Sequence, residues 1–295
     1  MITVMGATGH TGQYLVEQLL QAGQQVRALG RSASRLQPLA RLGASVLVGE
    51  PDNAAFLTRA FRDAAAVYTL LPYDMQVPDY YAMQRAQGEA IVHALRENGT
   101  GHVVFHSSLG AELPAGTGPI ASMHEQETRL RGLNGCNVLM LRTGALFENF
   151  YGALGVIKQA GLNGDAVAPD LPIPMIATRD LADVAAKALI ARDWHGVVVR
   201  ELLGPCDLSY AEATRLLGER IGQPDLNYVQ LTAEDMTGAL LGAGFSPNLA
   251  GLYVELAQAI NQGRIKSLEG RHPGNTTPTR FEDFAPELAA AYQAM

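Results

Sequence analysis

The chain has 295 residues, of which 47% are apolar and 17% charged, so it can bury a sizeable core and is not expected to be disordered. Its net charge of −7 and the absence of a basic stripe argue against a nucleic-acid-binding protein. No apolar run reaches the ~18 residues of a membrane span, so no membrane partner is expected. The N-terminus lacks a secretory signal pattern, and Cys136 and Cys206 have neither disulfide nor metal spacing, so we expect a cytoplasmic protein.

Short apolar segments alternate with helical patterns along the first half of the chain. We expect strands at 2–5, 26–29, 45–48, 66–71, 103–106 and 138–141. Between them we expect helices ending near Ala22, at 36–42, 54–62 and 80–97, and beginning near Ala121. Because proline is common in the first turn of a helix, we expect the second of these helices to begin close to Pro38. The strands are uniformly apolar, which is typical of a parallel sheet covered on both faces.

Beyond Arg142 the alternation becomes irregular. Residues 147–176 are rich in glycine, proline and aromatic side chains. A helix at 180–191 and a strand at 197–203 follow, and then helices at 210–221, 233–242 and 250–261. This part lacks the strands of a second nucleotide-binding unit. We therefore expect one domain over 1–150 and a smaller, mostly helical lobe over 151–295, with 176–203 returning to the first domain.

A glycine-rich motif stands between the first strand and the first helix. It consists of Gly6, Ala7, Thr8, Gly9, His10, Thr11 and Gly12, a G-x-x-G-x-x-G pattern. Gly6 allows a sharp turn, Gly9 lets backbone amides approach a pyrophosphate, and Gly12 lets the helix pack on the strand. The helix N-terminus suits an anion. In this context the motif predicts a dinucleotide-binding, Rossmann-type α/β domain with a doubly wound parallel sheet; a tight turn without a ligand is the alternative.

The residues after the second strand indicate which dinucleotide is bound. Arg31, Ser32 and Arg35 follow that strand, and no Asp or Glu lies between Val26 and Leu42. A carboxylate at this place usually holds the ribose 2′-hydroxyl of NAD, whereas the 2′-phosphate of NADP needs positive charge. Arg31 can bind a phosphate through two N–H groups, with Ser32 donating beside it. We therefore expect NADP(H) to be preferred over NAD(H); the alternative is that the arginines form only a solvated surface.

With these motifs, the chain resembles the NmrA-like branch of the atypical short-chain dehydrogenases/reductases over nearly its whole length. Further segments that carry the resemblance are Gly49-Glu50, Leu71-Pro72, Ser107-Ser108, Leu141-Arg142, Phe147-Glu148-Asn149 and 179–185. The C-terminal part of the chain also fits, with expected helices around Glu234 and Ala250 and with Gly263 after the second of these helices. The resemblance implies a cleft between sheet and lobe for the nicotinamide and a small-molecule acceptor. It places Leu71, Pro72, Tyr73 and Ser107 at the cofactor. Members are NADPH-dependent quinone or aldehyde-type reductases, or regulators that sense the dinucleotide.

Reductases of the wider superfamily carry a Tyr and, four residues later, a Lys on the helix after the fifth strand, where the Lys lowers the pKa of the proton-donating Tyr. The helix beginning near Ala121 has neither residue. In the NmrA-like branch a His often stands at the place of His124, so we expect His124, with Ser108 or a water as alternatives, to supply the proton. The alternative for His124 is a helix-surface or cofactor-amide contact. Tyr73 either stacks on the nicotinamide or packs within its loop.

Two functions follow from these features. The first is an NADPH-dependent oxidoreductase that transfers a hydride to a small quinone-like or carbonyl acceptor. The second is a non-catalytic NADP(H)-binding redox sensor that acts through a protein partner. The missing Tyr and Lys favour the sensor. The aromatic residues Phe147, Phe150 and Tyr151 favour the enzyme if they form a lid over a flat apolar substrate; the alternative is that they form the hydrophobic seam between the lobes. We expect no metal site, and a homodimer is compatible with either function.

Overall fold

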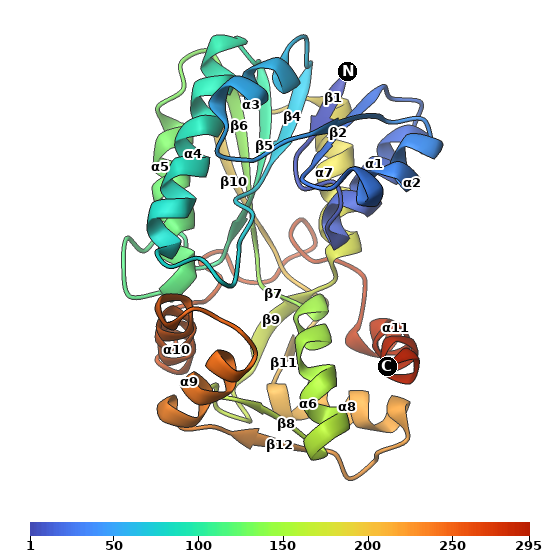
Figure 1. Ribbon diagram of the computed structural model, residues 1–295, viewed down its shortest axis with the longest axis vertical. Helices are drawn as coiled ribbons and strands as arrows, with labels where there is room; N and C mark the ends of the chain where they lie inside the picture. The colour runs from blue at the N-terminus through green and yellow to red at the C-terminus, as the bar shows by residue number, and fades with distance from the viewer.

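The computed structural model describes residues 1–295, and its centre is a seven-stranded sheet in the order β10-β6-β5-β4-β1-β2-β3 (Figure 1). The strands are β1 Ile2–Val4, β2 Val26–Gly30, β3 Ser45–Val48, β4 Ala66–Thr69, β5 His102–Ser108, β6 Asn137–Thr143 and β10 Val197–Leu202. All neighbouring pairs are parallel. The strand order reverses between β1 and β4, so the loops that leave these two strands flank the point where ligands bind in such sheets.

Helices cover both faces of this sheet (Figure 1). Those on one face are α1 His10–Gln21, α2 Ala33–Arg41 and α7 Thr178–Ala191, and those on the other are α3 Ala54–Phe61, α4 Tyr80–Glu97 and α5 Ala121–Arg131. Alternate residues of one strand enter the two cores, since Val104 packs with the first set of helices and Val103 and Phe105 with the second. This double covering explains the uniformly apolar strands. It confirms the predicted Rossmann-type α/β fold.

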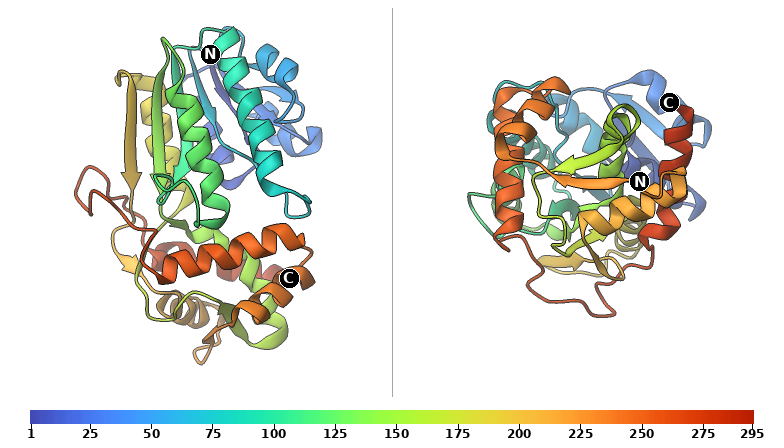
Figure 2. Two further views of the ribbon diagram at one scale, coloured as in Figure 1. Left: turned by 90° about the vertical axis from the view of Figure 1, so that its left-hand side faces the viewer. Right: turned by 90° about the horizontal axis from the view of Figure 1, so that it is seen from below.

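A smaller lobe lies beyond the carboxyl ends of the large sheet (Figures 1 and 2). Its helices are α6 Leu154–Ala160, α8 Tyr210–Ile221, α9 Ala233–Gly242, α10 Pro247–Asn261 and α11 Phe281–Ala294, with short 3₁₀ segments η1 Gly118–Ile120 and η2 Phe147–Ala153 nearby. Two small sheets complete it, formed by β7 Ala145–Leu146, β9 Ile173–Ile176 and β11 Asp207–Leu208, and by β8 Leu162–Asp165 and β12 Asn227–Gln230. None of the helices in the structure has the length and apolar composition of a membrane span.

The structure corrects three sequence-based expectations. Helix α2 begins at Ala33 rather than near Pro38, because the Ser32 hydroxyl caps it by accepting the Arg35 amide at 3.4 Å. Pro38 therefore lies inside the helix. The tail carries α11, which was not predicted, although Phe281, Phe284 and Leu288 recur at helical spacing and are buried. The two small sheets were also missed, because their strands have only two residues or are interrupted by Pro, Gly or polar residues and so lack an apolar run.

A long segment, residues 262–280, connects α10 to α11, and we call it the strap. It is fixed to β10 at several points. The Leu203 amide donates to the Asn275 carbonyl at 2.8 Å. The buried Glu201 carboxylate accepts the Leu268 amide at 2.8 Å and the hydroxyl of Ser267. The strap thus holds the lobe against the edge of the large sheet.

Candidate active site

The three glycines of the motif differ in what the fold requires of them. Gly6 has φ of +63°, and a Cβ there would lie 2.7 Å from the Cδ2 atom of Leu70. A Cβ on Gly12 would clash with the Gly6 carbonyl oxygen. Gly9 has φ of −88°, which any residue adopts, and its Cβ would meet only the Gly6 carbonyl oxygen, at 3.4 Å. Folding therefore requires Gly6 and Gly12, whereas Gly9 leaves space on an exposed surface that a ligand can approach.

The N-terminus of α1 is open next to Gly9. Gly9 is the N-cap and provides no side-chain hydrogen bond. The first helical amide with a carbonyl partner is that of Gln13, which donates to Gly9 at 2.9 Å. The amides of His10, Thr11 and Gly12 precede it and have no intrahelical acceptor. An N-terminus with free amides and no capping side chain is suited to a phosphate group.

The end of β2 presents one cation that the protein leaves unpaired. Arg31 is exposed and makes neither a hydrogen bond nor an ion pair, whereas Arg35 donates from Nη2 to the Thr8 carbonyl at 2.8 Å. The first turn of α2 contains no acidic residue. Ser32 caps that helix, and its hydroxyl lies 2.9 Å from the hydroxyl of Ser34. Arg31 is therefore free to bind a phosphate, while Arg35 also shapes the glycine turn.

Because Arg31 has no protein partner, its replacement tests cofactor choice without disturbing the fold. We expect Arg31→Glu to weaken NADPH binding by about 1.5–3 kcal/mol, the range for a charge-assisted hydrogen bond, and to leave NADH binding nearly unchanged. Isothermal titration calorimetry with both dinucleotides measures this difference. Arg41→Glu, at the other end of α2, is a matched control that should change neither affinity. Equal NADPH affinity in wild type and Arg31→Glu would contradict the assignment of Arg31.

The loop that leaves β4 contains Leu71, Pro72 and Tyr73. Leu71 is buried, and the Pro72 carbonyl accepts a hydrogen bond from Nε2 of Gln84 at 2.8 Å. The Tyr73 side chain is 52% exposed. It is therefore the member of this loop whose side chain is free to contact a ligand, although its predicted stacking on the nicotinamide stays a prediction.

The two serines at the end of β5 are occupied by protein contacts. The Ser107 side chain is buried, and its hydroxyl donates to Oε1 of Glu127 at 2.6 Å. The Ser108 hydroxyl donates to the neighbouring Leu109 carbonyl at 3.0 Å. Donation of a proton by either hydroxyl would first require these bonds to break, whereas each hydroxyl oxygen can still accept a hydrogen bond.

His124 stands near the start of α5, where the sequence places it. Its Nδ1 lies 2.9 Å from the Ala111 carbonyl, and because a carbonyl only accepts, Nδ1 carries the proton and donates it. Nε2 is thus the ring nitrogen that remains available to a substrate. Four residues later, at the place of the superfamily Lys, Thr128 donates its hydroxyl to the His124 carbonyl at 2.9 Å. No ammonium group supports a proton donor on this helix.

A buried ion pair beneath these residues was not predicted. Arg142, on β6, donates from Nε to Oε1 of Glu127 at 2.9 Å and from Nη2 to Oε2 at 2.7 Å. Its Nη1 also donates to Glu112 at 3.0 Å. Burial raises the pKa of Glu127, but the hydrogen bonds from Arg142 and Ser107 outweigh it and hold the pKa below its ordinary value. The pair fixes α5, and with it His124, against the ends of β5 and β6.

The predicted aromatic residues after β6 divide into two groups. Phe147 and Phe150 are buried in the lobe core and pack edge-on against Phe281, with ring centroids 5.2 and 5.1 Å away. They join η2 to α11, so the lid interpretation is wrong for these two residues. Tyr151 is different, because its ring stacks on His10 at a centroid distance of 5.2 Å. This contact joins the lobe to the residue that follows Gly9.

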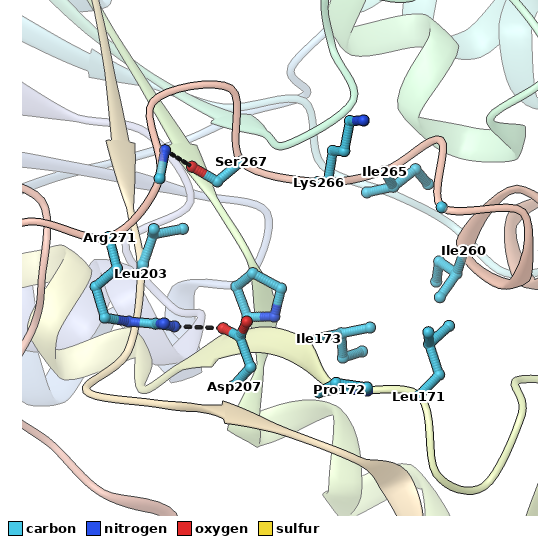
Figure 3. A pocket seen from close by; sticks show the side chains of 13 residues that line it. Leu171, Pro172, Ile173, Leu203, Asp207, Ile260, Ile265, Lys266, Ser267 and Arg271 are labelled. Atoms are coloured by element: carbon cyan, nitrogen blue, oxygen red, sulfur yellow. Dashed lines mark hydrogen bonds and ion pairs between the residues drawn. The ribbon is translucent and has the colours of Figure 1, made fainter.

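A pocket of about 290 Å³ lies under the strap (Figure 3). Its walls include Ile173 and Ile260 on the lobe side, Ile265 on the strap, and the ion pair of Arg271 and Asp207. None of the predicted cofactor or catalytic residues lines it. The pocket is therefore a feature separate from the glycine turn and the loops at the ends of β4 and β5.

The model of the NmrA-like family matches residues 1–285. The chain belongs to the NmrA-like family. This confirms the resemblance inferred from the motifs. The match covers the large sheet, the strap and the first part of α11, so the lobe belongs to the family pattern as well.

Curated relatives of this NmrA-like chain include a reductase and a quinone oxidoreductase. It is 28% identical to the (4-alkanoyl-5-oxo-2,5-dihydrofuran-3-yl)methyl phosphate reductase of Streptomyces griseus, over 99% of each chain. It is 25% identical to quinone oxidoreductase 2 of Escherichia coli, over 90% of each chain. The fold matches the NADPH complex of the latter with a TM-score of 0.81 at 23% identity, covering 98% of this chain and 99% of that one. It also matches Citrobacter sp. triphenylmethane reductase with NADP(H), at a TM-score of 0.81 and 20% identity over 98% and 100%.

Proposed function

We propose that this NmrA-like protein is an NADPH-dependent reductase that transfers a hydride to a small quinone-like or carbonyl acceptor. The observation that carries the proposal is Gly9, a glycine that the fold does not need, beside an open helix N-terminus. The unpaired Arg31 at the end of β2 adds the charge that a 2′-phosphate requires. Two curated relatives, one named as a quinone oxidoreductase and the other as a reductase of a dihydrofuranyl methyl phosphate, support the reaction class.

The residues present fit NADPH along the carboxyl ends of the strands. The pyrophosphate is assigned to Gly9 and the first amides of α1, and the adenosine 2′-phosphate to Arg31 and Ser32. The nicotinamide is assigned to the loops after β4 and β5, between Tyr73 and His124. NADPH, when bound, supplies the hydride.

The acceptor gains one hydride and one proton, so a quinone becomes a hydroquinone or an aldehyde becomes an alcohol, while NADPH becomes NADP⁺. A quinone that receives a hydride becomes a delocalised hydroquinone anion, so it needs correct placement more than a strong acid. An aldehyde becomes a localised alkoxide and needs a proton donor during the transfer. The helix that carries His124 and Thr128 lacks the Tyr and Lys pair. This favours quinones over simple aldehydes.

A panel of quinones and aldehydes tests this function through the absorbance of NADPH. We expect neutral benzoquinones and naphthoquinones to be reduced with turnover, and aldehydes to react far more slowly. NADPH should be used in preference to NADH. If no acceptor in the panel oxidises NADPH, the reductase proposal is wrong and the sensor interpretation replaces it.

The role of His124 is tested by removing its imidazole. If Nε2 of the protonated ring donates to the acceptor, His124→Ala should lower turnover about 10²–10⁴-fold and leave NADPH affinity nearly intact. His93→Ala, at an exposed position on α4, is the matched control and should leave turnover unchanged. Full turnover in His124→Ala would assign the proton to water and remove His124 from the chemistry. Lost NADPH affinity with preserved saturated turnover would make it a cofactor contact instead.

A further inference from the structure

The loop between β4 and α4 is attached to both parts of the molecule, on either side of Tyr73. On one side, the Met75 carbonyl accepts a hydrogen bond from the amide of Ser246, the N-cap of α10, at 2.7 Å. Helix α10 lies directly below α4 and α5 in Figure 2 (left, orange-red). On the other side, the Pro72 carbonyl accepts a hydrogen bond from Nε2 of Gln84, on α4, at 2.8 Å. Tyr73 therefore lies between an attachment to the lobe and an attachment to the large domain.

The bond from Gln84 is the only hydrogen bond on the peptide unit that joins Pro72 to Tyr73. Neither Pro72 nor Tyr73 takes part in a hydrogen bond between backbone groups. The carbonyl of Pro72 and the amide of Tyr73 belong to one planar unit. A bond that holds this carbonyl therefore fixes the plane from which the Tyr73 residue continues.

Gln84 holds this carbonyl at a cost to the fold. Its side chain is only 1% exposed, and its Oε1 is buried without a hydrogen-bond partner, which destabilises a folded protein. Gln87, on the same helix, is also buried and also has an unpartnered Oε1, but it makes no hydrogen bond to the loop. An apolar side chain of the same length would avoid the unpartnered oxygen at position 84. What the Gln84 amide adds is the bond to Pro72.

We propose that Gln84 is a positioning residue of the reductase: through the Pro72 carbonyl it holds Tyr73 against the nicotinamide and so sets the orientation of that ring. The proposal rests on the function proposed above, which assigns the nicotinamide to this loop. Hydride transfer requires the ring to be placed within a fraction of an ångström of its productive position. The phosphates of the cofactor are assigned to Gly9 and Arg31, away from this loop. Gln84 should therefore govern the order of the ring and the rate of transfer, and not the affinity for NADPH.

Binding of NADPH without an acceptor tests the order of the ring. Gln84→Met keeps the length of the side chain and removes its amide. We expect it to change the Kd for NADPH, measured by calorimetry, less than about twofold, because the charge-assisted contacts are made to the phosphates. The fluorescence lifetime of the bound nicotinamide should fall towards that of NADPH in water, because the ring is no longer held. Gln87→Met is the matched control and should change neither value.

The rate of hydride transfer is measured in a single turnover with 1,4-naphthoquinone. Gln84→Met should slow this step about 10- to 100-fold, as for a ring displaced by ~1 Å. Gln84→Glu provides a rescue that depends on pH, because its carboxyl can donate to the Pro72 carbonyl only when it is protonated. Relative to wild type, its rate and its nicotinamide lifetime should recover as the pH falls from about 8 to about 5. Gln84→Met should show no such recovery.

Unchanged lifetime and rate in a folded Gln84→Met would overturn the proposal, as would equal losses in Gln87→Met. Lost NADPH affinity in Gln84→Met would also overturn it, because the residue would then support binding rather than orient the ring. If Gln84→Met does not fold, the lifetime in Gln84→Glu decides, and a value independent of pH contradicts the proposal. If the lifetime results hold but wild type never reduces the quinone, the orienting role is supported and the reductase function is what fails. The two proposals are therefore distinguishable.

Discussion

Gly9→Val is expected to abolish binding of NADPH and of NADH while the protein stays folded. The backbone at Gly9 has φ of −88° and ψ of 170°, which valine adopts readily. Its Cβ would meet only the Gly6 carbonyl oxygen, at 3.4 Å. The added methyl groups would instead fill the space in which a pyrophosphate approaches the first amides of α1. Calorimetric titration should show no binding, and circular dichroism should show an unchanged thermal transition.

The other glycines of the motif provide the control. A side chain on Gly12 would clash with the Gly6 carbonyl oxygen and lie 2.7 Å from the Ala7 Cα. Gly12→Ala should therefore destabilise the fold itself, in contrast to Gly9→Val. If Gly9→Val binds NADPH with wild-type affinity, the phosphate site lies elsewhere in the molecule.

Glu127→Ala is expected to lower the free energy of unfolding by about 3–5 kcal/mol, because it leaves the buried Arg142 guanidinium without its main partner. Glu127 accepts two hydrogen bonds from Arg142 and one from Ser107. Chemical denaturation measures the change. The double variant Glu127→Met with Arg142→Met, which removes both charges and keeps the volume, should recover much of the loss. A loss below about 1 kcal/mol in Glu127→Ala would show that the pair is solvated rather than buried.

The Glu127 carboxylate also makes the free energy of unfolding depend on pH. The pKa of Glu127 in the folded protein is lowered relative to the unfolded chain. The stabilisation that the Glu127 carboxylate contributes is therefore complete at pH values above the pKa of Glu in the unfolded chain, about 4.3. It is lost as the pH falls through the pKa of Glu127 in the folded protein. Wild type should lose more unfolding free energy than the double Met variant over this acidic range. Identical slopes for the two proteins would contradict the ion pair.

The sequence predicts those parts of the fold that depend on local patterns. Helices α4, α8 and α9 begin and end where their apolar periodicity indicates, at Tyr80–Glu97, Tyr210–Ile221 and Ala233–Gly242. The order of strands and helices suffices to indicate a parallel sheet, because the central strands β1, β4, β5 and β6 are too apolar to face water. The position of Arg31 in sequence equally indicates a cation at the end of β2.

What the sequence does not reveal depends on contacts between distant segments. Nothing in the sequence near Ser107 indicates that its hydroxyl donates a hydrogen bond to Glu127, 20 residues later. A single Arg in the otherwise apolar segment of β6 is the one signal that could have pointed to a buried partner. Similarly, Arg31 and Arg35 look equivalent in sequence, and only the structure shows that Arg35 already holds the Thr8 carbonyl.

A single-turnover experiment tests the reductase function most directly. The protein is loaded with one equivalent of NADPH and mixed with excess 1,4-naphthoquinone, while NADPH fluorescence and hydroquinone formation are followed together. We predict that bound NADPH disappears and that one hydroquinone forms for each NADPH oxidised. The reaction should be faster than in free solution in wild type, and no faster than in free solution in Gly9→Val. If NADPH stays bound and unoxidised in wild type while NADPH and NADP⁺ bind with unequal affinity, the protein is a sensor and not a reductase.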